Sequence, residues 1–414
     1  MRSNLFRPLR ALLLVNGIGS LSGYVCLNKL VRFARRLVLL GLILYCAAWA
    51  YRIQYRKYYV WLPGYFSWLM HPEERAGAGP VHVFFLFADH FEPGENFDMT
   101  EQWVDQYPKI ADRHRDSAGR PWQHTWFYPA EQPIDRNLAA LRQLVRGGYG
   151  EVELHLHHGN DDNQTGRVRF QQSVQYLQKF DFLKGTDGQT HFAFVHGNWS
   201  LDNSNGRALC GIDRELTILR EQGCFADYTF SSIWVNAQPP TINNIYMATD
   251  DDGPKSYARG TLLNTNGMPS GDLLIFQGPL LLLPDFQLRR LHRSLGVAVE
   301  NAEIHAAVPV TPKRIDAWVR ANIHVPGRPD WVFIKVHGHG GTEQRDAEEM
   351  LGPELDRGLA YLEKNYNDGT RYVLHYITAR EAYNLVRAAV DRKTGDPRQY
   401  YDYRIPPYLA NGSR

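Results

Sequence analysis

The segment 153–162, ELHLHHGNDD, places three histidines and two aspartates within ten residues. Imidazole and carboxylate groups together suit Zn²⁺ or a similar divalent ion. His157 and Asp161 are four residues apart, as are His158 and Asp162, and His155 shares a strand face with His157. We therefore predict a metal site with His155, His157 and Asp161 as ligands. A further ligand is expected from His90, next to Asp89.

A metal in such a site would lower the pKa of a bound water and polarise a substrate carbonyl. Asp89 is predicted to act as the general base on that water. A histidine of the HGHG segment, His337 or His339, would protonate the leaving group. Together these residue types describe the hydrolysis of an ester or an amide.

The predicted site residues follow apolar runs that alternate with helical patterns, which is typical of parallel strands joined by crossover helices. Strands are predicted at 81–89, 124–130, 151–158, 191–198, 228–234, 273–283, 331–340 and 372–378. Helices are predicted at 99–116, 134–148, 167–180, 214–223, 353–366 and 379–390. The expected fold class is α/β. A distorted (β/α) barrel of about seven strands is favoured at this length, with an open doubly wound sheet as the alternative.

Side chains point alternately to the two faces of a strand, and this alternation indicates where the site lies. Asp89, His155, His196 and His337 each continue one alternating face of an apolar run, near its carboxyl end. In α/β barrels the active site forms at that rim. We therefore expect these strand ends to converge, so that Asp89, His157 and His337 meet around a cation at one mouth of a barrel. The barrel is predicted over 78–392, after a linker at 56–77 and before a tail at 393–414.

The N-terminal segment predicts a membrane anchor. Residues 1–36 are basic and apolar, and the run LVLLGLILYCAAWAY that follows carries no charge between Arg36 and Arg52. We predict a transmembrane helix at 37–55 with snorkelling arginines, in preference to a buried core helix or a signal peptide. The excess of basic residues before it would leave the N-terminus in the cytoplasm and the body periplasmic or extracytoplasmic. A second span at 11–27 would reverse that orientation.

The distribution of charged residues indicates which classes of partner the protein could bind. Ten of the 46 basic residues fall in residues 1–57, where no acidic residue occurs, so the remainder carries 36 basic against 44 acidic residues. A mildly acidic body argues against nucleic acid as a partner, and the basic head suits a membrane. Cys210 and Cys224 could form one disulfide if the body is exported. The absence of a CxxC motif argues against a cysteine-based zinc site.

The order of these motifs resembles that of the polysaccharide deacetylases, the metal-dependent N- and O-deacetylases of chitin, peptidoglycan and exopolysaccharides. FLFADHFEP (85–93) looks like the first strand of that family, with Asp89 in the place of the base and His90 in that of a ligand. HTWFYPA (124–130) is similar to the second strand. RGGYGEVELHLHHGND (146–161) resembles the third, in which Asp161 replaces the second histidine of the family.

Two later motifs complete the resemblance, which covers roughly residues 80–380. FVHGNWSLD (194–202) falls where the family builds its groove wall, which implies substrate contacts for His196, Asn198 and Trp199. FIKVHGHG (333–340) resembles the last strand, with His337 in the place of the acid.

The resemblance implies an enzyme, a carbohydrate deacetylase that depends on a divalent metal, preferably Zn²⁺. With the predicted transmembrane helix, this enzyme would be anchored in the membrane. Its substrate would be an acetylated surface polysaccharide or exopolysaccharide. A glycoside hydrolase on the same barrel, which would use paired carboxylates, is one alternative. A non-catalytic glycan-binding protein of the envelope is the other.

Overall fold

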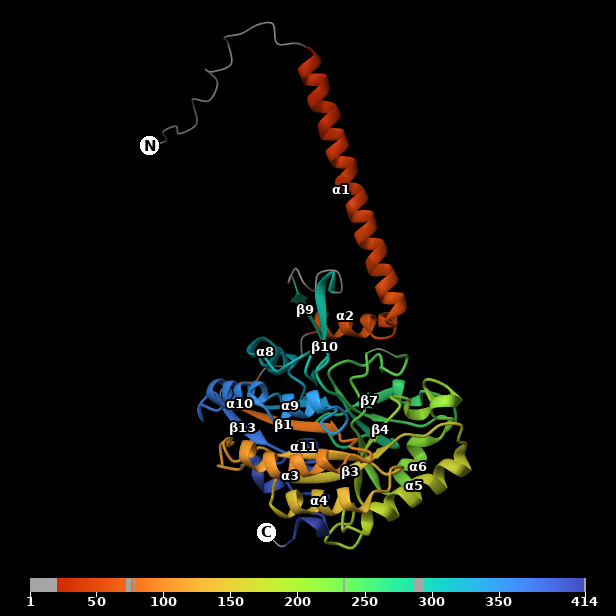
Figure 1. The fold of residues 1–414 in the computed structure, drawn as a ribbon, viewed down its shortest axis with the longest axis vertical. Helices are drawn as coiled ribbons and strands as arrows, with labels where there is room; N and C mark the ends of the chain where they lie inside the picture. Colours follow the sequence, from red (N-terminus) through yellow and green to blue (C-terminus); the bar gives the residue numbers. More distant parts are fainter. Residues whose placement is uncertain (1–20, 72–75, 78, 234, 286–293, 413–414) are drawn as a thin grey trace. The chain divides into compact units, whose positions relative to one another are not determined.

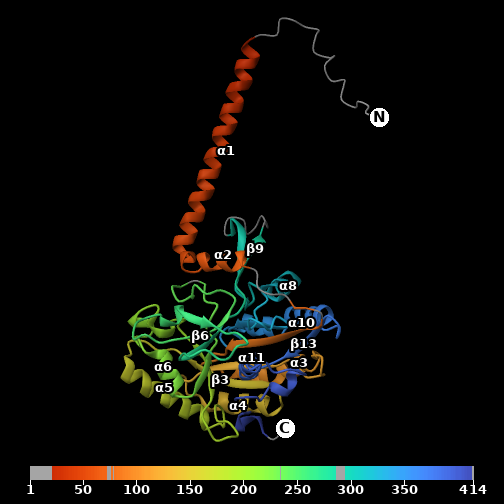
Figure 2. The ribbon, with the colours of Figure 1, turned by 180° about the vertical axis from the view of Figure 1, so that it is seen from behind.

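The computed structural model describes residues 21–71, 76–77, 79–233, 235–285 and 294–412. The chain divides into two compact units, Met1–Tyr55 and Arg56–Arg414. The first unit contains the helix α1 (Leu21–Tyr55). The second unit holds the sheet, the remaining helices and the predicted site residues (Figures 1 and 2).

The prediction of a membrane-spanning helix at 37–55 is wrong. Throughout the described ranges, every helix is either too short or too polar to cross a membrane. The uncharged part of α1 runs only from Leu37 to Tyr51, with arginines directly beyond both ends. A span needs about 20 apolar residues. The anchored, extracytoplasmic placement depended on that span and is therefore overturned. Of the second predicted apolar segment, residues 11–20 lie outside the described part of the chain.

The body is built on one large, mainly parallel sheet. Its strands run in the order β11-β12-β1-β2-β3-β4-β5-β8-β6-β7, and β13 also pairs with β1. All neighbours are parallel except β6, which runs antiparallel to both β8 and β7. The strands are β1 (Val81–His90), β2 (His124–Pro129), β3 (Gly150–Leu156), β4 (Phe192–His196), β5 (Cys224–Asp227), β6 (Ile245–Ala248), β7 (Gly260–Leu262), β8 (Leu273–Phe276), β11 (Glu303–Ile304), β12 (Trp331–Gly338) and β13 (Tyr372–Tyr376).

The sheet curls into a half barrel. Phe276 of β8 packs on Phe333 of β12, with 5.6 Å between ring centroids, although five strands separate β8 from β12 in the sheet. Lys335 of β12 likewise donates to backbone oxygens just beyond β5, at Tyr228 and Phe230. The end strands β11 and β7 are nevertheless not paired with each other in the described structure. The expected α/β class is therefore found, but as an open sheet with more strands than the predicted barrel of about seven.

Amphipathic helices cover the convex face of the sheet. Val152, Leu154 and Leu156 of β3 face this layer, and every one of them is buried in the main core. Pro353 and Thr378 mark the starts of the last two long helices, as N1 proline and N-cap respectively. The helices of the body are α2 (Leu62–Met70), α3 (Phe97–Ala111), α4 (Asp135–Arg146), α5 (Asn163–Gln178), α6 (Glu215–Glu221), α8 (Pro312–Ala321), α9 (Gln344–Met350), α10 (Pro353–Tyr366) and α11 (Ala379–Val390).

The helix α11 lies on the concave face, in contact with both β1 and β4 (Figures 1 and 2). Its Arg380 is fully buried and binds Glu151 of β3, with Nε and Nη2 each 2.9 Å from Oε1. Asn411, near the end of the chain, donates to the same oxygen. The amino ends of the strands are thus filled by α11 and the following segment, which leaves the carboxyl ends for a site.

The segments on either side of the sheet belong to the same compact unit. Residues 56–70 form a short 3-10 helix at Tyr58–Val60 and α2, in which Trp61 is fully buried. Residues 393–412 hold two further 3-10 turns and bury Tyr408. A separate antiparallel pair is formed by β9 (Leu281–Asp285) and β10 (Gly296–Glu300).

Candidate metal centre

The carboxyl ends of β12, β1 and β3, with the residues that follow them, bring four histidines and one glutamate together. His90 ends β1, and Glu92 follows it by two residues. His155 lies in β3 and His157 directly after it. His339 follows β12, which pairs with β1. We call these five residues the inner group.

Glu92 is the centre of the inner group. Its Oε1 is 3.1 Å from Nε2 of His155 and 3.7 Å from Nε2 of His157. His90 and His339 have ring centroids 4.8 Å apart. Two triads share Glu92, one with His90 and His339 and one with His155 and His157, and in each the nearest ligand atoms lie within 4.8 Å of one another. Such spacing suits side chains that converge on a bound ion.

The pKa shifts of His90 and Glu92 suit metal ligands, whereas the pKa of His157 is raised, because the lowering effect of burial is outweighed by the hydrogen bond to Glu131 and the charge of Glu92. Burial holds the pKa of His90 well below its ordinary value, and the nearby His339 and His155 lower it further. Burial alone would raise the pKa of Glu92, but the imidazoles of His155 and His157 bring it below its ordinary value. A neutral imidazole beside an ionised carboxylate is the state in which both bind a cation.

Several polar atoms of the inner group have no hydrogen-bond partner within the described structure. They include Nδ1 of His90 and both ring nitrogens of His155, although Nε2 of His155 lies 3.1 Å from Oε1 of Glu92. Buried polar atoms of proteins are nearly always paired. A divalent ion would satisfy one nitrogen of an imidazole that binds it, so the residues present fit a metal.

Two neighbours hold His157 in place. Oε1 of Glu131 lies 2.6 Å from Nδ1 of His157, leaving Nε2 to face Glu92. Metal-binding histidines are commonly oriented by a carboxylate in this way. On the other side, a Cβ at Gly197 would lie 2.5 Å from the His157 ring, so glycine is needed there.

A cavity of about 90 Å³ adjoins the inner group. Trp199, His337 and His339 line it, together with Ser231, Ser232, Ile233, Val235, Asn301 and Glu303. Trp199 stacks on His90 with 4.7 Å between centroids, and the His337 ring lies 5.6 Å from Trp199. Burial and the nearby Lys335 hold the pKa of His337 well below its ordinary value. A small acyl group would fit this cavity beside the histidines.

The structure places Asp89 outside the inner group. Its carboxylate lies on the convex face, where Oδ2 is 3.1 Å from Nε2 of His124 and Oδ1 accepts from the N–H of Gly340. Strand β1 is apolar on both faces, so alternation showed which residues share a face but not which face is concave. The expected meeting of Asp89 with His157 and His337 is not formed.

Asp161 and His196 belong to a different cluster. Asp161 binds Arg169, with Oδ2 2.9 Å from Nε, and lies 3.3 Å from Nδ1 of His158. His196 is fully buried on the convex side, beside His158. Asn198 donates to the backbone oxygen of His158. Of the three predicted substrate contacts, only Trp199 adjoins the inner group.

Two tryptophans and two cysteines lie outside the inner group. Trp122 and Trp126 are fully buried in an aromatic core. The disulfide considered for Cys210 and Cys224 is not formed, and both residues are free thiols in the structure.

Sequence reasoning missed Glu92 and Glu131. Each follows a predicted strand by two residues or fewer, in FEP and PAEQP respectively. Because the carboxyl ends of adjacent parallel strands share one edge, acidic residues in those loops were the available signal.

No protein-family model and no curated protein significantly matches the chain. Among solved structures, it is similar to a GH57 branching enzyme from the hyperthermophilic archaeon Thermococcus kodakaraensis, in complex with glucose. The identity is 12%, with 71% of this chain and 70% of that chain covered and a TM-score of 0.36. A second similar structure is the Xyl-CE4 domain of a multidomain xylanase from the hindgut metagenome of Trinervitermes trinervoides. Its identity is 11%, with 81% and 100% covered and a TM-score of 0.31. These TM-scores are too low to assign a family or an activity.

Proposed function

We propose that this protein is a metal-dependent hydrolase that removes acetyl groups from an N- or O-acetylated carbohydrate, a surface polysaccharide or exopolysaccharide. The observation that carries the proposal is the inner group, four histidines around Glu92 beside a small cavity. The motif order shared with polysaccharide deacetylases supports the choice of substrate class. The proposal assigns no cellular location.

The triad of Glu92, His155 and His157 would hold the divalent ion, and three protein ligands would leave a position open for water and substrate. The nitrogen and carboxylate donors of this triad suit Zn²⁺ among the common divalent metals. When bound, such an ion lowers the pKa of water and polarises an acyl carbonyl. Glu131 would hold His157 in its binding orientation throughout.

The residues around the inner group would move the protons and place the sugar. Glu131 keeps Oε2 without a partner in the described structure, so we assign proton acceptance to it in place of Asp89. His337 lines the cavity with Nδ1 also unpartnered there. Its lowered pKa keeps it neutral, so it would donate a hydrogen bond to the leaving oxygen or nitrogen while Glu131 passes the accepted proton to that atom. Trp199 would stack against the sugar.

The test is acetate release from a panel of acetylated glycans by zinc-loaded protein. Wild-type protein is expected to release acetate, and a chelator should abolish the release. His155→Ala should lower it by more than about 100-fold by removing a ligand. The matched control is His191→Ala, since His191 pairs with Asp187 away from the inner group.

Three outcomes would contradict the proposal. The first is the absence of acetate release by wild-type protein across the panel, and the second is full release by His155→Ala. The third is chelator-insensitive cleavage of the glycan chain, which would instead indicate a glycoside hydrolase. Tight glycan binding by metal-free protein without turnover would indicate a binding protein.

A further inference from the structure

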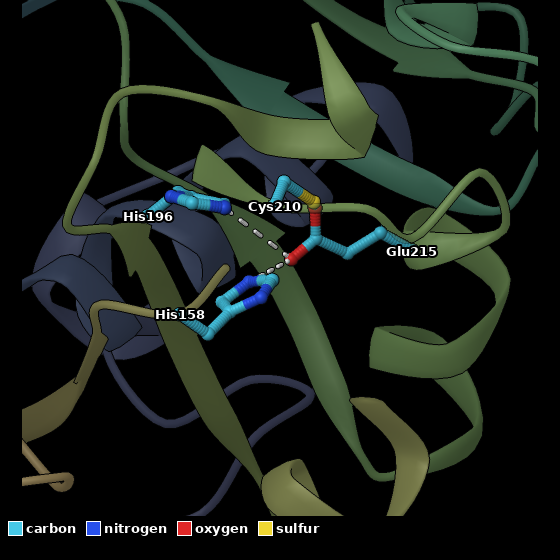
Figure 3. A group of neighbouring side chains, drawn as sticks. All are labelled: His158, His196, Cys210 and Glu215. Carbon is cyan, nitrogen blue, oxygen red and sulfur yellow. Dashed lines mark hydrogen bonds and ion pairs between the residues drawn. The ribbon is translucent and has the colours of Figure 1, made fainter. Parts of the chain in front are cut away.

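A second set of metal-binding side chains lies on the convex side of the sheet. It consists of His158 after β3, His196 at the end of β4, Cys210 in the following loop and Glu215 at the start of α6. Figure 3 shows both imidazoles directed at the Glu215 carboxylate, with the cysteine sulfur beside it. We call these four residues the buried group.

The spacing within the buried group is that of metal ligands. Oε1 of Glu215 lies 3.0 Å from Nε2 of His158 and 3.8 Å from Nε2 of His196. Its Oε2 lies 3.4 Å from Sγ of Cys210. One ligand atom from each residue lies within 4.8 Å of all the others. Around tetrahedral zinc, with bonds of about 2.0 to 2.3 Å, neighbouring ligand atoms are roughly 3.3 to 3.8 Å apart.

The four side chains are shut off from solvent. His196, Cys210 and Glu215 are fully buried, and His158 is 5% exposed. Within the described structure, Nε2 of His196 has no hydrogen-bond partner. An unpaired buried nitrogen is costly, and water has little access to relieve it.

A carboxylate stands behind one of the ligands. Oδ2 of Asp161 lies 3.3 Å from Nδ1 of His158 without a hydrogen bond, while Nε2 is hydrogen-bonded to Oε1 of Glu215 at 3.0 Å. When Nε2 binds a metal, the ring proton would move to Nδ1 and face the Asp161 carboxylate. Arg169 in turn binds Asp161. A carboxylate behind a histidine is the usual support for a metal ligand.

We propose that His158, His196, Cys210 and Glu215 hold a structural Zn²⁺ ion. Four protein ligands would leave no open position, which distinguishes this site from a catalytic one. The thiolate and the carboxylate would balance the charge of the ion. This site is independent of the proposed hydrolase activity, and it places a cysteine ligand where no CxxC motif exists.

Binding the ion would cost local hydrogen bonds. The N–H groups of Asn198 and Ser200 donate to Nδ1 of His196 over 3.2 and 3.5 Å. A ring that binds metal through Nε2 carries its proton on Nδ1, so both would be lost, and the bond from His158 to Glu215 would be replaced by bonds to the ion. The ion would in return tie the ends of β3 and β4 to α6. Those strand ends carry His157 and Gly197, whose contact helps to shape the inner group.

Sulfur allows the site to be tested on the wild-type protein. The inner group has only nitrogen and oxygen ligands, so a metal–sulfur bond can come only from the buried group among the described clusters. We expect X-ray absorption of the fully zinc-loaded full-length protein to show a sulfur neighbour at about 2.3 Å. Cobalt substitution should give a thiolate-to-cobalt charge-transfer band. A first coordination shell of nitrogen and oxygen alone would overturn the proposal.

Variants provide the second measurement. Cys210→Ala should bind one zinc fewer per chain than wild type and lose the charge-transfer band. Cys224→Ala, which removes the other buried thiol of the body, should keep both. His155→Ala should keep the band even if activity is lost, so failure of the hydrolase proposal remains distinguishable. Retention of full zinc content and band by Cys210→Ala would also overturn the proposal.

Discussion

At the scale of single residues, Glu131 has two separable tasks. It orients His157 through a 2.6 Å contact, and we assign to it the acceptance of a proton. Glutamine can still accept from Nδ1 of His157 but cannot take the proton. Glu131→Gln should therefore keep the metal while kcat falls by about 10²- to 10⁴-fold.

Removal of the whole side chain should affect both tasks. Glu131→Ala is expected to weaken metal affinity by about 10- to 100-fold, in addition to the loss in kcat. Metal titration and steady-state kinetics on both variants separate the two effects. Equal metal affinities for the glutamine and alanine variants would argue against the orienting role.

Glu349 of α9 predicts a pH dependence of stability. Burial, together with the neighbouring Glu354, raises the pKa of Glu349 from 4.5 to about 7. The folded state then keeps a proton that the unfolded chain has already released, so its stabilising effect is lost as pH rises through that range. We compare the free energy of unfolding of Glu349→Gln with that of wild type. The difference should shift in favour of the variant by on the order of 1 kcal/mol when the pH rises from about 5 to about 8. Urea unfolding at the two pH values measures the difference, and a gain that is the same at both would contradict it.

The sequence predicted part of the inner group. His90, His155 and His157 were expected as ligands and do lie together, because imidazoles at strand ends are a specific signal. Asp89 and His196 were expected at the same mouth but lie on the convex face. A strand buried on both sides has two apolar faces, and the sequence alone does not indicate which one turns inward.

At the scale of elements, α11 and the segment after it pack inside the half barrel at the amino ends of its strands. Arg380 binds Glu151 there with both groups fully buried. Arg380→Met would leave the carboxylate uncompensated and should destabilise the protein by about 3 to 5 kcal/mol. Arg371→Met, at an exposed arginine stacked on Tyr372, is the control and should change stability by less than about 0.5 kcal/mol. Chemical denaturation measures both, and similar losses would refute the filling role.

Prediction of elements succeeded where local signals were complete. The patterns at 353–366 and 379–390 match α10 and α11 in full, because caps and amphipathic spacing agree. The run 273–283 instead divides into β8 and the start of β9, which belong to different sheets. Hydrophobicity continues across that break, so only tertiary pairing separates the two strands.

At the scale of the whole molecule, the body should be independent of residues 1–55. The two units are compact by themselves, and the sheet and both clusters lie in the second. A chain that begins at residue 56 should therefore unfold at the same temperature as the full chain. A chain that begins at residue 72 would lose the buried Tyr58, Trp61 and Tyr65 and should be less stable by at least about 3 kcal/mol. Calorimetry of the two truncated chains tests this prediction. Equal stability of the chains that begin at residues 56 and 72 would contradict it.

The placement of α11 bears on how the proposed polysaccharide substrate would reach the histidines. Because a helix closes the amino end of the half barrel, such a glycan would have no channel through which to pass. It would instead lie sideways over the open rim and offer one sugar at a time to the cavity. The proposed enzyme would then act at internal positions along the polymer and would not need a free chain end.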